Sequence, residues 1–200
     1  MKQLEQLDGL DIAFAGLVFD KNSPRYAGNS FAKGAIANAD LDIRSVGVFT
    51  NADYDEIMTI AETYGLDMVQ LHGNESPELC EQLSDELEVI KAFSIGEHLE
   101  EYVDDLIMDY DEVCDYYLFD SFADDRVGGT GHKFDWKKIV NSKIEKPFFI
   151  SGGIQPADGP LLKGFKHPDF YAVDINSRFE KEPGVKDMSL VLQFIHSVKK

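Results

Sequence analysis

The sequence contains little cysteine, few basic residues and no long apolar run. Its 200 residues include two cysteines, Cys80 and Cys114, which are too few for a disulfide framework and show no metal-ligand spacing. No stretch of about 18 uncharged apolar residues is present, so no membrane-spanning helix is expected. The first residues also lack the apolar stretch of a secretion signal. These absences predict a cytoplasmic protein with reduced thiols and no metal centre.

Acidic residues outnumber basic residues almost two to one. The chain carries 37 aspartates and glutamates against 19 lysines and arginines, a formal net charge of -18. This balance disfavours nucleic acid and anionic membranes as partners, and a site for an anionic ligand would have to be locally positive. The hydrophobic content of 44% over 200 residues suits a chain that can bury a core. We expect residues 1–200 to form one domain.

Short apolar runs alternate with helical segments along the chain. Most of the runs are continuously apolar, as in strands of a parallel sheet that is covered on both faces. The seven expected strands span residues 13–19, 44–50, 67–72, 89–95, 116–121, 147–153 and 171–177. Seven helical segments are expected at residues 29–38, 54–64, 76–87, 99–110, 134–141, 157–164 and 186–199.

This alternation predicts an α/β fold with right-handed crossovers, either a doubly wound sheet or a barrel. A Rossmann sheet would carry Gly-x-Gly-x-x-Gly after an early strand, and the sequence has no such segment. Glycine-rich and polar ends fall instead on the last two strands, at residues 151–153 and 176–178. Barrel enzymes place a phosphate site there. The pattern therefore favours a TIM-type (β/α)8 barrel.

The number of strands does not match the number of helices. Leu4, Leu7 and Leu10 lie at helical spacing, so the chain begins with an eighth helix, whereas only seven strands are expected. A barrel of eight strand–helix units would begin with a strand. We therefore expect a barrel that lacks strand 1. Its sheet should be open between residues 13–19 and 171–177 unless a neighbouring chain fills the gap.

Two strand ends suggest a phosphate site. The adjacent Gly152 and Gly153 would let backbone N–H groups approach an anion closely, and Asn176 and Ser177 could donate further hydrogen bonds. The alternative is that the two glycines only make a tight turn from strand to helix. Because both segments follow the last two strands, the pair together favours phosphate binding.

Asp120 ends an apolar strand and should therefore point into the mouth of the barrel. A carboxyl in that position can act as a general acid. The alternatives are a solvated loop aspartate or a helix-capping group. The glycine-dense segment at residues 128–131 follows it, and it is typical of a mobile lid, of a turn that brings backbone near a ligand, or of a flexible connector.

Three further residues suggest binding or acid–base roles. Arg25 follows Pro24 in the loop after the first strand, and its planar fork suits a carboxylate, although a lone arginine is often only solvated. His72, at a strand end, is either an acid–base group or a hydrogen-bonded structural histidine. Asp174 lies inside a strand facing the mouth and needs a partner, either a ligand hydroxyl or a lysine such as Lys91.

Taken together, these residues resemble the phosphoribosylanthranilate isomerase family, whose members are barrel enzymes of tryptophan biosynthesis. The matching segments run in family order from about residue 13 to the end of the chain. They are Gly16-Leu-Val-Phe, Ser23-Pro-Arg-Tyr, Val46-Gly-Val-Phe, Val69-Gln-Leu-His-Gly-Asn-Glu-Ser, Val89-Ile-Lys-Ala, Phe119-Asp-Ser, Gly128-Gly-Thr-Gly, Phe134-Asp-Trp, Ser151-Gly-Gly-Ile, Val173-Asp-Ile-Asn-Ser and Pro183-Gly-Val-Lys-Asp. Each segment is modest alone, but the ordered set is specific.

The resemblance implies an Amadori rearrangement without cofactor or metal. N-(5-phosphoribosyl)anthranilate opens its ribose ring and becomes 1-(2-carboxyphenylamino)-1-deoxyribulose 5-phosphate. By the family's pattern, Asp120 would be the general acid, Arg25 would hold the anthranilate carboxylate and Asp174 would contact a ribose hydroxyl. The implied phosphate-binding residues are Gly152, Gly153, Asn176 and Ser177, with Arg178 close by.

The chain departs from the family at the general base. The family's base is a cysteine in a Lys-x-Cys-Gly motif at the end of the first strand, and this sequence contains no such motif. Cys80 is expected inside a helix and Cys114 before a strand, so neither replaces it. We therefore expect the 200-residue chain to be catalytically impaired. One explanation is an internal methionine taken as the start, and the other is a natural variant without the strand.

Two other functions remain open for this sequence. A non-catalytic barrel could bind a sugar phosphate without turning it over. Another phosphosugar enzyme is the second alternative, but indole-glycerol-phosphate synthase would need a lysine and glutamate pair at its strand ends, and a pentose-phosphate epimerase would need a metal-binding His-Asp set. Neither set is apparent. In each case the partner is a small phosphosugar, and the protein is a monomer or a homodimer.

Overall fold

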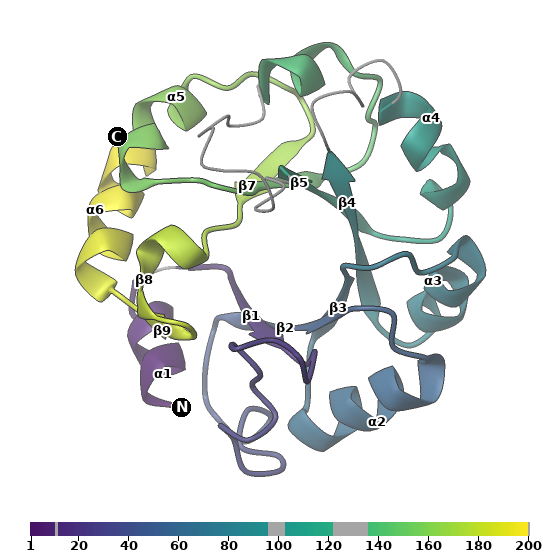
Figure 1. Ribbon diagram of the computed structural model, residues 1–200, viewed down its shortest axis with the longest axis vertical. Coiled ribbons are helices and arrows are strands. Elements are labelled where there is room, and N and C mark those ends of the chain that lie inside the picture. The colour runs from purple at the N-terminus through teal and green to yellow at the C-terminus, as the bar shows by residue number, and fades with distance from the viewer. Residues whose placement is uncertain (11, 96–102, 122–135, 200) are drawn as a thin grey trace.

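Seven parallel strands form one curled sheet in the computed structural model, which describes residues 1–10, 12–95, 103–121 and 136–199 (Figure 1). The strands pair in chain order, each parallel to the next. They are β1 Phe14–Val18, β2 Arg44–Phe49, β3 Met68–Leu71, β4 Glu88–Ile95, β5 Tyr116–Ser121, β6 Phe148–Ser151 and β7 Phe170–Val173. This order confirms the expected barrel that lacks a strand.

The strand sequences explain why the sheet is covered on both faces. All four residues of β3 and all four of β6 are buried, including the polar Gln70 and Ser151, as expected for strands of a parallel sheet that is covered on both faces. Side chains on the convex face pack against the helices in one large apolar cluster. A smaller cluster of strand residues fills the concave side, and it consists of Val46, Met68, Ile90, Ala92, Leu118 and Phe149.

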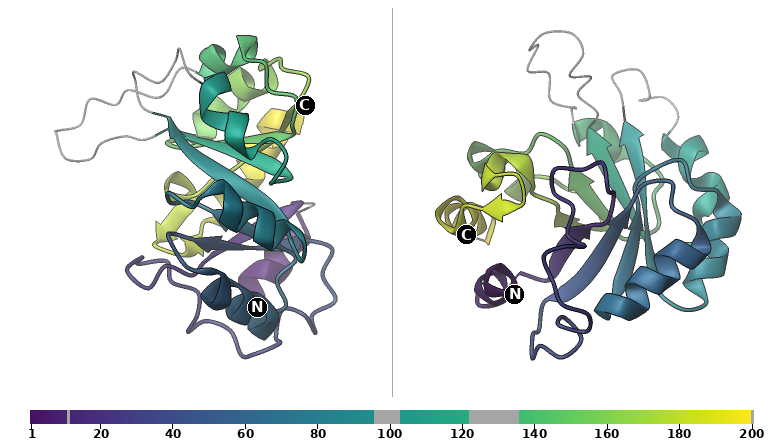
Figure 2. Two further views of the ribbon diagram at one scale, coloured as in Figure 1. Left: turned by 90° about the vertical axis from the view of Figure 1, so that its right-hand side faces the viewer. Right: turned by 60° about the horizontal axis from the view of Figure 1, so that its bottom comes forward.

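Six α-helices are present among the described residues, and in Figures 1 and 2 they lie outside the sheet. Two of the helix ends carry common capping residues: the Ser76 side chain accepts a hydrogen bond from the Leu79 N–H, and Gly65 ends its helix in the left-handed conformation, with φ +68°. The helices are α1 Lys2–Asp8, α2 Tyr54–Tyr64, α3 Pro77–Ser84, α4 Val103–Ile107, α5 Gly159–Lys163 and α6 Met188–Lys199.

The expected helix at residues 29–38 is wrong. This segment forms a series of single turns, such as those closed by hydrogen bonds from Ala35 N to Ala32 O and from Asn38 N to Gly34 O. Gly34 has φ +69°, a left-handed conformation that interrupts any α-helix running through it. The chain therefore has fewer α-helices among its described residues than the eight that the sequence predicted.

Two other segments differ from their expected form. The described part of the expected helix at 134–141 is a 3-10 helix, Trp136–Asn141, and the one at 157–164 begins with a 3-10 turn, Pro156–Asp158. A small antiparallel hairpin of β8, Glu180–Glu182, and β9, Val185–Lys186, was not predicted at all. This β8–β9 hairpin turns at Gly184, which has φ +81°.

Strands β1 and β7 are the two edges of the sheet and do not pair with each other in the described part of the chain, so the expected gap is confirmed. Aromatic side chains reach across it, since the Phe14 ring lies 6.0 Å from that of Tyr171 and 5.4 Å from that of Phe149. Helix α1 lies beside the β8–β9 hairpin (Figure 2), where Gln3 bonds the Gly184 carbonyl and the Lys186 N–H. The described helices include none long and apolar enough to cross a membrane.

Candidate active site

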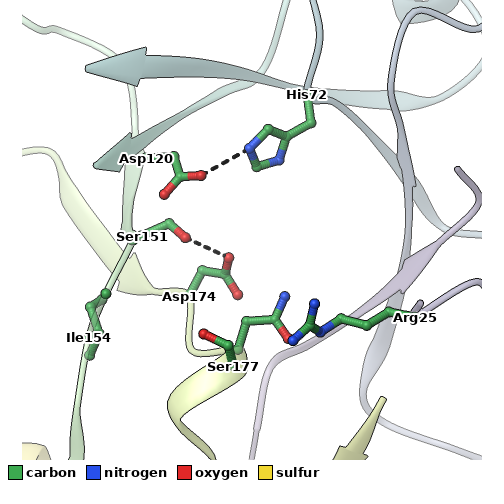
Figure 3. Close-up of a pocket in the computed structure, with 10 residues that line it drawn as sticks. Arg25, His72, Asp120, Ser151, Ile154, Asp174 and Ser177 are labelled. Carbon is green, nitrogen blue, oxygen red and sulfur yellow. Dashed lines mark hydrogen bonds and ion pairs between the residues drawn. The ribbon is translucent and has the colours of Figure 1, made fainter. Parts of the chain in front are cut away.

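A pocket of about 310 Å³ opens at the carboxyl ends of the strands (Figure 3). All seven residues that the sequence predicted for the site line it, although they come from segments up to about 150 residues apart. Three further residues, His72, Ser151 and Ile154, complete the wall. The predicted residues are Arg25, Asp120, Gly152, Gly153, Asp174, Asn176 and Ser177.

The alternation of side chains along the strands puts the polar groups in this pocket. On β5, Leu118 belongs to the apolar cluster of the concave side, and Asp120, two residues further, lies on the same face at the pocket. On β3 the same spacing leads from buried Met68 through Gln70 to His72. The concave face is therefore apolar along the middle of the strands and polar at their carboxyl ends, while at the amino-terminal ends Arg44 and Glu88 form an ion pair at 2.7 Å.

Asp120 is hydrogen-bonded to His72, which the sequence analysis did not pair with it. The distance from Asp120 Oδ2 to His72 Nε2 is 3.1 Å, and the other ring nitrogen, Nδ1, lies 2.7 Å from Gln70 Nε2. An amide nitrogen can only donate, so with Gln70 oriented in this way Nδ1 accepts and the ring proton is on Nε2. His72 therefore donates to Asp120. No other hydrogen bond to the Asp120 carboxyl is found among the described residues, which leaves Oδ1 available to a ligand.

Asp174 is paired with Ser151 and not with Lys91. The Ser151 hydroxyl donates to Asp174 Oδ2 at 2.9 Å, so the prediction that Lys91 could be its partner is wrong. Burial raises the pKa of Asp174, and the nearby Asp120 charge raises it further, while the Ser151 hydrogen bond and Lys186 act in the opposite direction. The Asp174 carboxyl thus lies close to Asp120 and to the turn formed by Gly152 and Gly153 after β6, which we call the glycine turn.

The expected phosphate residues form one end of the pocket. Gly152 and Gly153 have φ +88° and +61°, conformations that L-residues with side chains rarely adopt. A Cβ at Gly153 would meet nothing within 4 Å, so the space in front of this backbone is open. Asn176 and Ser177 face it from the segment after β7, whereas Arg178 is exposed and does not line the pocket.

Arg25 enters the pocket from the loop after β1, beside Ser177 (Figure 3), and is held by Glu180, a residue that the sequence did not point to. Its Nε lies 3.1 and 3.0 Å from the two Glu180 oxygens, and its Nη2 lies 2.7 Å from Oε2. Hydrogen bonding to Glu180 raises the pKa of Arg25. Burial would raise the pKa of Glu180, but its hydrogen bonds to Arg25 and Lys186 outweigh burial and lower it. Both groups are therefore charged at neutral pH.

Lys91 belongs to a buried ion pair beneath the His72 loop. Its Nζ lies 2.8 Å from Glu75 Oε2 and 2.8 Å from the Gly73 carbonyl, and the pair is almost fully buried, with side chains 3% and 1% exposed. Glu75 also accepts hydrogen bonds from the N–H groups of Asn51 and Gly73. The pair thereby joins the loops after β2 and β3 to β4 and fixes the backbone next to His72.

Replacing Lys91 with methionine is expected to lower the free energy of unfolding by about 3–5 kcal/mol, because it leaves the Glu75 charge buried and unpaired. Denaturant unfolding at pH 7 measures this loss. Burial would raise the pKa of Glu75, but the Lys91 contacts outweigh it and lower the pKa from 4.5. The stability from the pair is therefore complete above pH 4.5 and is lost as the pH falls below it.

The matched control is the Lys91→Met/Glu75→Met double variant, which removes both charges and should be less destabilised than the single variant. The difference in stability between the parent and Lys91→Met should also shrink below pH 4.5. A Lys91→Met variant as stable as the parent at pH 7 would show that the pair does not hold this loop.

Neither cysteine is near the pocket chemistry. Cys80 lies inside α3 and Cys114 lies just before β5, as expected, and both are buried. Burial raises the pKa of the Cys80 thiol to about 11 and that of the Cys114 thiol to about 12. Since a thiol must ionise to act as a base or nucleophile, neither suits proton abstraction at neutral pH, and neither lines the pocket.

Two predictions concern residues that the structure does not describe, or describes only in part. The glycine segment at residues 128–131 lies outside the described residues. Within the described part of the chain, no group of three or more histidine, cysteine, aspartate or glutamate residues is arranged to hold a metal ion.

The chain is similar to known isomerases over almost its whole length. The family model described as N-(5'phosphoribosyl)anthranilate (PRA) isomerase matches residues 2–197. A relative from Parabacteroides distasonis named N-(5'-phosphoribosyl)anthranilate isomerase is 37% identical over 199 residues, which cover 98% of this chain and 88% of the relative.

Solved structures show the same similarity. The crystal structure of phosphoribosyl anthranilate isomerase from Thermotoga maritima has a TM-score of 0.84 and 29% identity, covering 99% of this chain and 93% of that one. Another structure holds phosphoribosyl anthranilate isomerase in complex with reduced 1-(o-carboxyphenylamino)-1-deoxyribulose 5-phosphate, with a TM-score of 0.81, 28% identity and the same coverage.

Proposed function

Because this chain belongs to the phosphoribosylanthranilate isomerase family, we propose that its pocket binds N-(5-phosphoribosyl)anthranilate and directs its Amadori rearrangement. One observation carries the proposal: an arginine, a carboxyl group and a glycine turn line a single pocket, in the roles that a substrate with an anion at each end requires. The sugar lies between the two anions, next to the carboxyl group.

The substrate is oriented by its two ends. Arg25 binds the anthranilate carboxylate, while the backbone N–H groups of Gly152 and Gly153, with Asn176 and Ser177, bind the phosphate. In Figure 3, Arg25 reaches into the pocket from the wall opposite Asp120 and Ser151. The ribose then lies over Asp174, whose carboxyl can accept a hydrogen bond from a sugar hydroxyl.

Asp120 supplies the proton that opens the ring. Its carboxyl protonates the ribose ring oxygen, the bond from that oxygen to the first sugar carbon breaks, and the nitrogen lone pair forms the Schiff base. His72 holds Asp120 through Oδ2, so the proton leaves from Oδ1. A base must then remove the proton from the second sugar carbon, after which the enol rearranges to the ketone.

Cys80 and Cys114 cannot perform the second proton transfer, since both are buried with raised pKa values. We therefore propose that the 200-residue chain binds the substrate and isomerises it slowly. The family's usual base, a thiol at the end of a first strand, is absent from these residues.

Two measurements on the purified 200-residue chain test this function. Calorimetric titration should detect binding of reduced 1-(o-carboxyphenylamino)-1-deoxyribulose 5-phosphate, and conversion of N-(5-phosphoribosyl)anthranilate, followed by chromatography, should exceed the rate in buffer. A chain that does not bind the reduced product would contradict the proposal. Binding without any conversion would favour the non-catalytic phosphosugar-binding barrel instead.

A further inference from the structure

We propose that Glu180 is a positioning residue, which holds one edge of the Arg25 guanidinium so that the other edge faces the substrate carboxylate, while Lys186 keeps the group of three positively charged. The proposal rests on the function proposed above and assigns roles to two residues outside the predicted site. It concerns the orientation and charge of Arg25, not the chemistry of the sugar.

The geometry of Arg25 leaves one edge of its guanidinium available. A guanidinium offers two pairs of parallel N–H donors, one from Nε and Nη2 and one from Nη1 and Nη2. Glu180 occupies the first pair. Among the described residues no hydrogen bond to Nη1 is present, and Arg25 lines the pocket. The second pair is therefore the one that a ligand carboxylate can use.

Glu180 acts on the long side chain of Arg25 and not on its backbone. The backbone lies in the loop that follows β1, where the Arg25 N–H donates to Ser23 Oγ at 3.1 Å and the next residue, Tyr26, bridges to Val18. A free arginine side chain loses rotamer entropy when a ligand immobilises it. Glu180 removes part of that cost in advance, because its hydrogen bonds already hold the Arg25 side chain in the ligand-free protein. Its own side chain is only 4% exposed, whereas that of Arg25 is 25% exposed.

Glu180 is itself fixed by the β8–β9 hairpin. It pairs with Lys186 across the hairpin, and its carboxylate accepts a further hydrogen bond from the Gly184 N–H at 3.2 Å. The hairpin is also joined to α1 by the two hydrogen bonds of Gln3. A carboxylate held on several sides can orient a mobile arginine instead of following its motion.

Lys186 gives the group of Arg25, Glu180 and Lys186 a net positive charge. An arginine and a glutamate that form an ion pair have no net charge together, so the pair would attract an anion only weakly. The chain as a whole, with a net charge of -18, would repel it. The Lys186 ammonium lies 3.1 Å from Glu180 Oε1, so the three groups together carry one positive charge. Lys186 also donates to Asn176 Oδ1 at 2.7 Å, which turns the Asn176 amide so that its NH2 is free to donate to the phosphate.

Two ligands that differ in one group test the proposal. The first is reduced 1-(o-carboxyphenylamino)-1-deoxyribulose 5-phosphate, and the second is the same compound without its carboxyl group. In the Glu180→Gln variant, we expect the dissociation constant of the first ligand to rise about 10-fold and that of the second to change less than about 3-fold, because only the first ligand has the carboxylate that the oriented Arg25 binds. Calorimetric titration measures both.

A purely electrostatic role gives the opposite result. Glu180→Gln removes a negative charge beside the pocket, so if charge alone mattered both ligands would bind the variant more tightly, and the proposal would be overturned. Glu182→Gln is the matched control: it makes the same charge change on an exposed residue of the same strand and should leave both dissociation constants unchanged. Lys186→Gln should weaken both ligands, because it lowers the charge and frees Asn176; unchanged binding would refute its role.

Nuclear magnetic resonance of the ligand-free protein gives an independent signature. The Arg25 Nε–H should exchange slowly with solvent in the parent and in Glu182→Gln, and rapidly in Glu180→Gln. Thermal unfolding verifies that each variant is folded. If the parent binds neither ligand, the proposed function fails; if the parent binds the first ligand but Glu180→Gln changes both ligands equally or neither, only the positioning role fails.

Discussion

Joining a β-strand that ends in Lys-x-Cys-Gly to the amino terminus of this chain is expected to raise its isomerisation rate about 100- to 10,000-fold, the usual contribution of a well-placed acid–base group. The sheet has a place for such a strand, since β1 and β7 are both edges among the described residues. An added parallel strand would pair with both, which the unpaired edges favour.

The topology puts the added thiol at the pocket. Helix α1 precedes the parallel strand β1, so it runs back from the carboxyl edge of the sheet to its amino edge. Residues joined before Met1 therefore lie at the carboxyl edge, which carries Asp120 and the glycine turn. We expect a thiol at this edge to face the pocket and not the core, a setting that favours ionisation more than the burial of Cys80 does.

The same extension with serine in place of cysteine separates the effect of the thiol on the rate from the effect of the added strand on stability. Both extended chains should be more stable than the 200-residue chain, because both close the sheet, but only the cysteine form should gain the rate. Steady-state turnover of N-(5-phosphoribosyl)anthranilate measures the difference. If the serine form gained as much, closure of the barrel would limit the rate; if the cysteine form gained nothing, a base other than this thiol would be required.

The strands were predictable because burial on both faces leaves a direct trace in the sequence. Adjacent apolar residues, such as Met68-Val69 in β3 and Phe148-Phe149-Ile150 in β6, are typical of strands in a parallel sheet. The segment at residues 29–38 misled for a related reason: its composition suits a helix, and only the left-handed backbone at Gly34 shows that the chain turns there. The β8–β9 hairpin, only a few residues long, is too short to produce a periodic signal.

The residues that line the pocket could be grouped from the sequence, but the contacts between them could not. Side chains at the ends of parallel strands must meet at one edge, which is why Asp120, Asp174 and the glycine turn could be grouped. Their partners follow no such rule. Glu180 lies 155 residues from Arg25, and nothing in the spacing of Glu75 shows that it takes Lys91 as its partner.

Replacing Asp120 with asparagine is expected to lower the turnover number about 100- to 10,000-fold while leaving ligand affinity nearly unchanged. The amide has the shape of the carboxyl and can still accept the His72 hydrogen bond, but it cannot give a proton to the ring oxygen. The measurement is best made in the chain extended with the cysteine strand, where turnover is fastest. Calorimetry with the reduced product should show a change in dissociation constant below about 3-fold, because uniform binding is not affected.

Asp174→Asn is the matched comparison, since it makes the same change on a neighbouring carboxyl of the same pocket. We expect it to weaken binding, with a smaller effect on turnover at saturation, because Asp174 bonds Ser151 and, in the proposed function, orients the sugar. The two variants therefore separate the acid from the orienting group. If Asp120→Asn kept more than a tenth of the parent turnover, the proton would have to come from another group, and His72, at 3.1 Å from Asp120, would be the donor to test next.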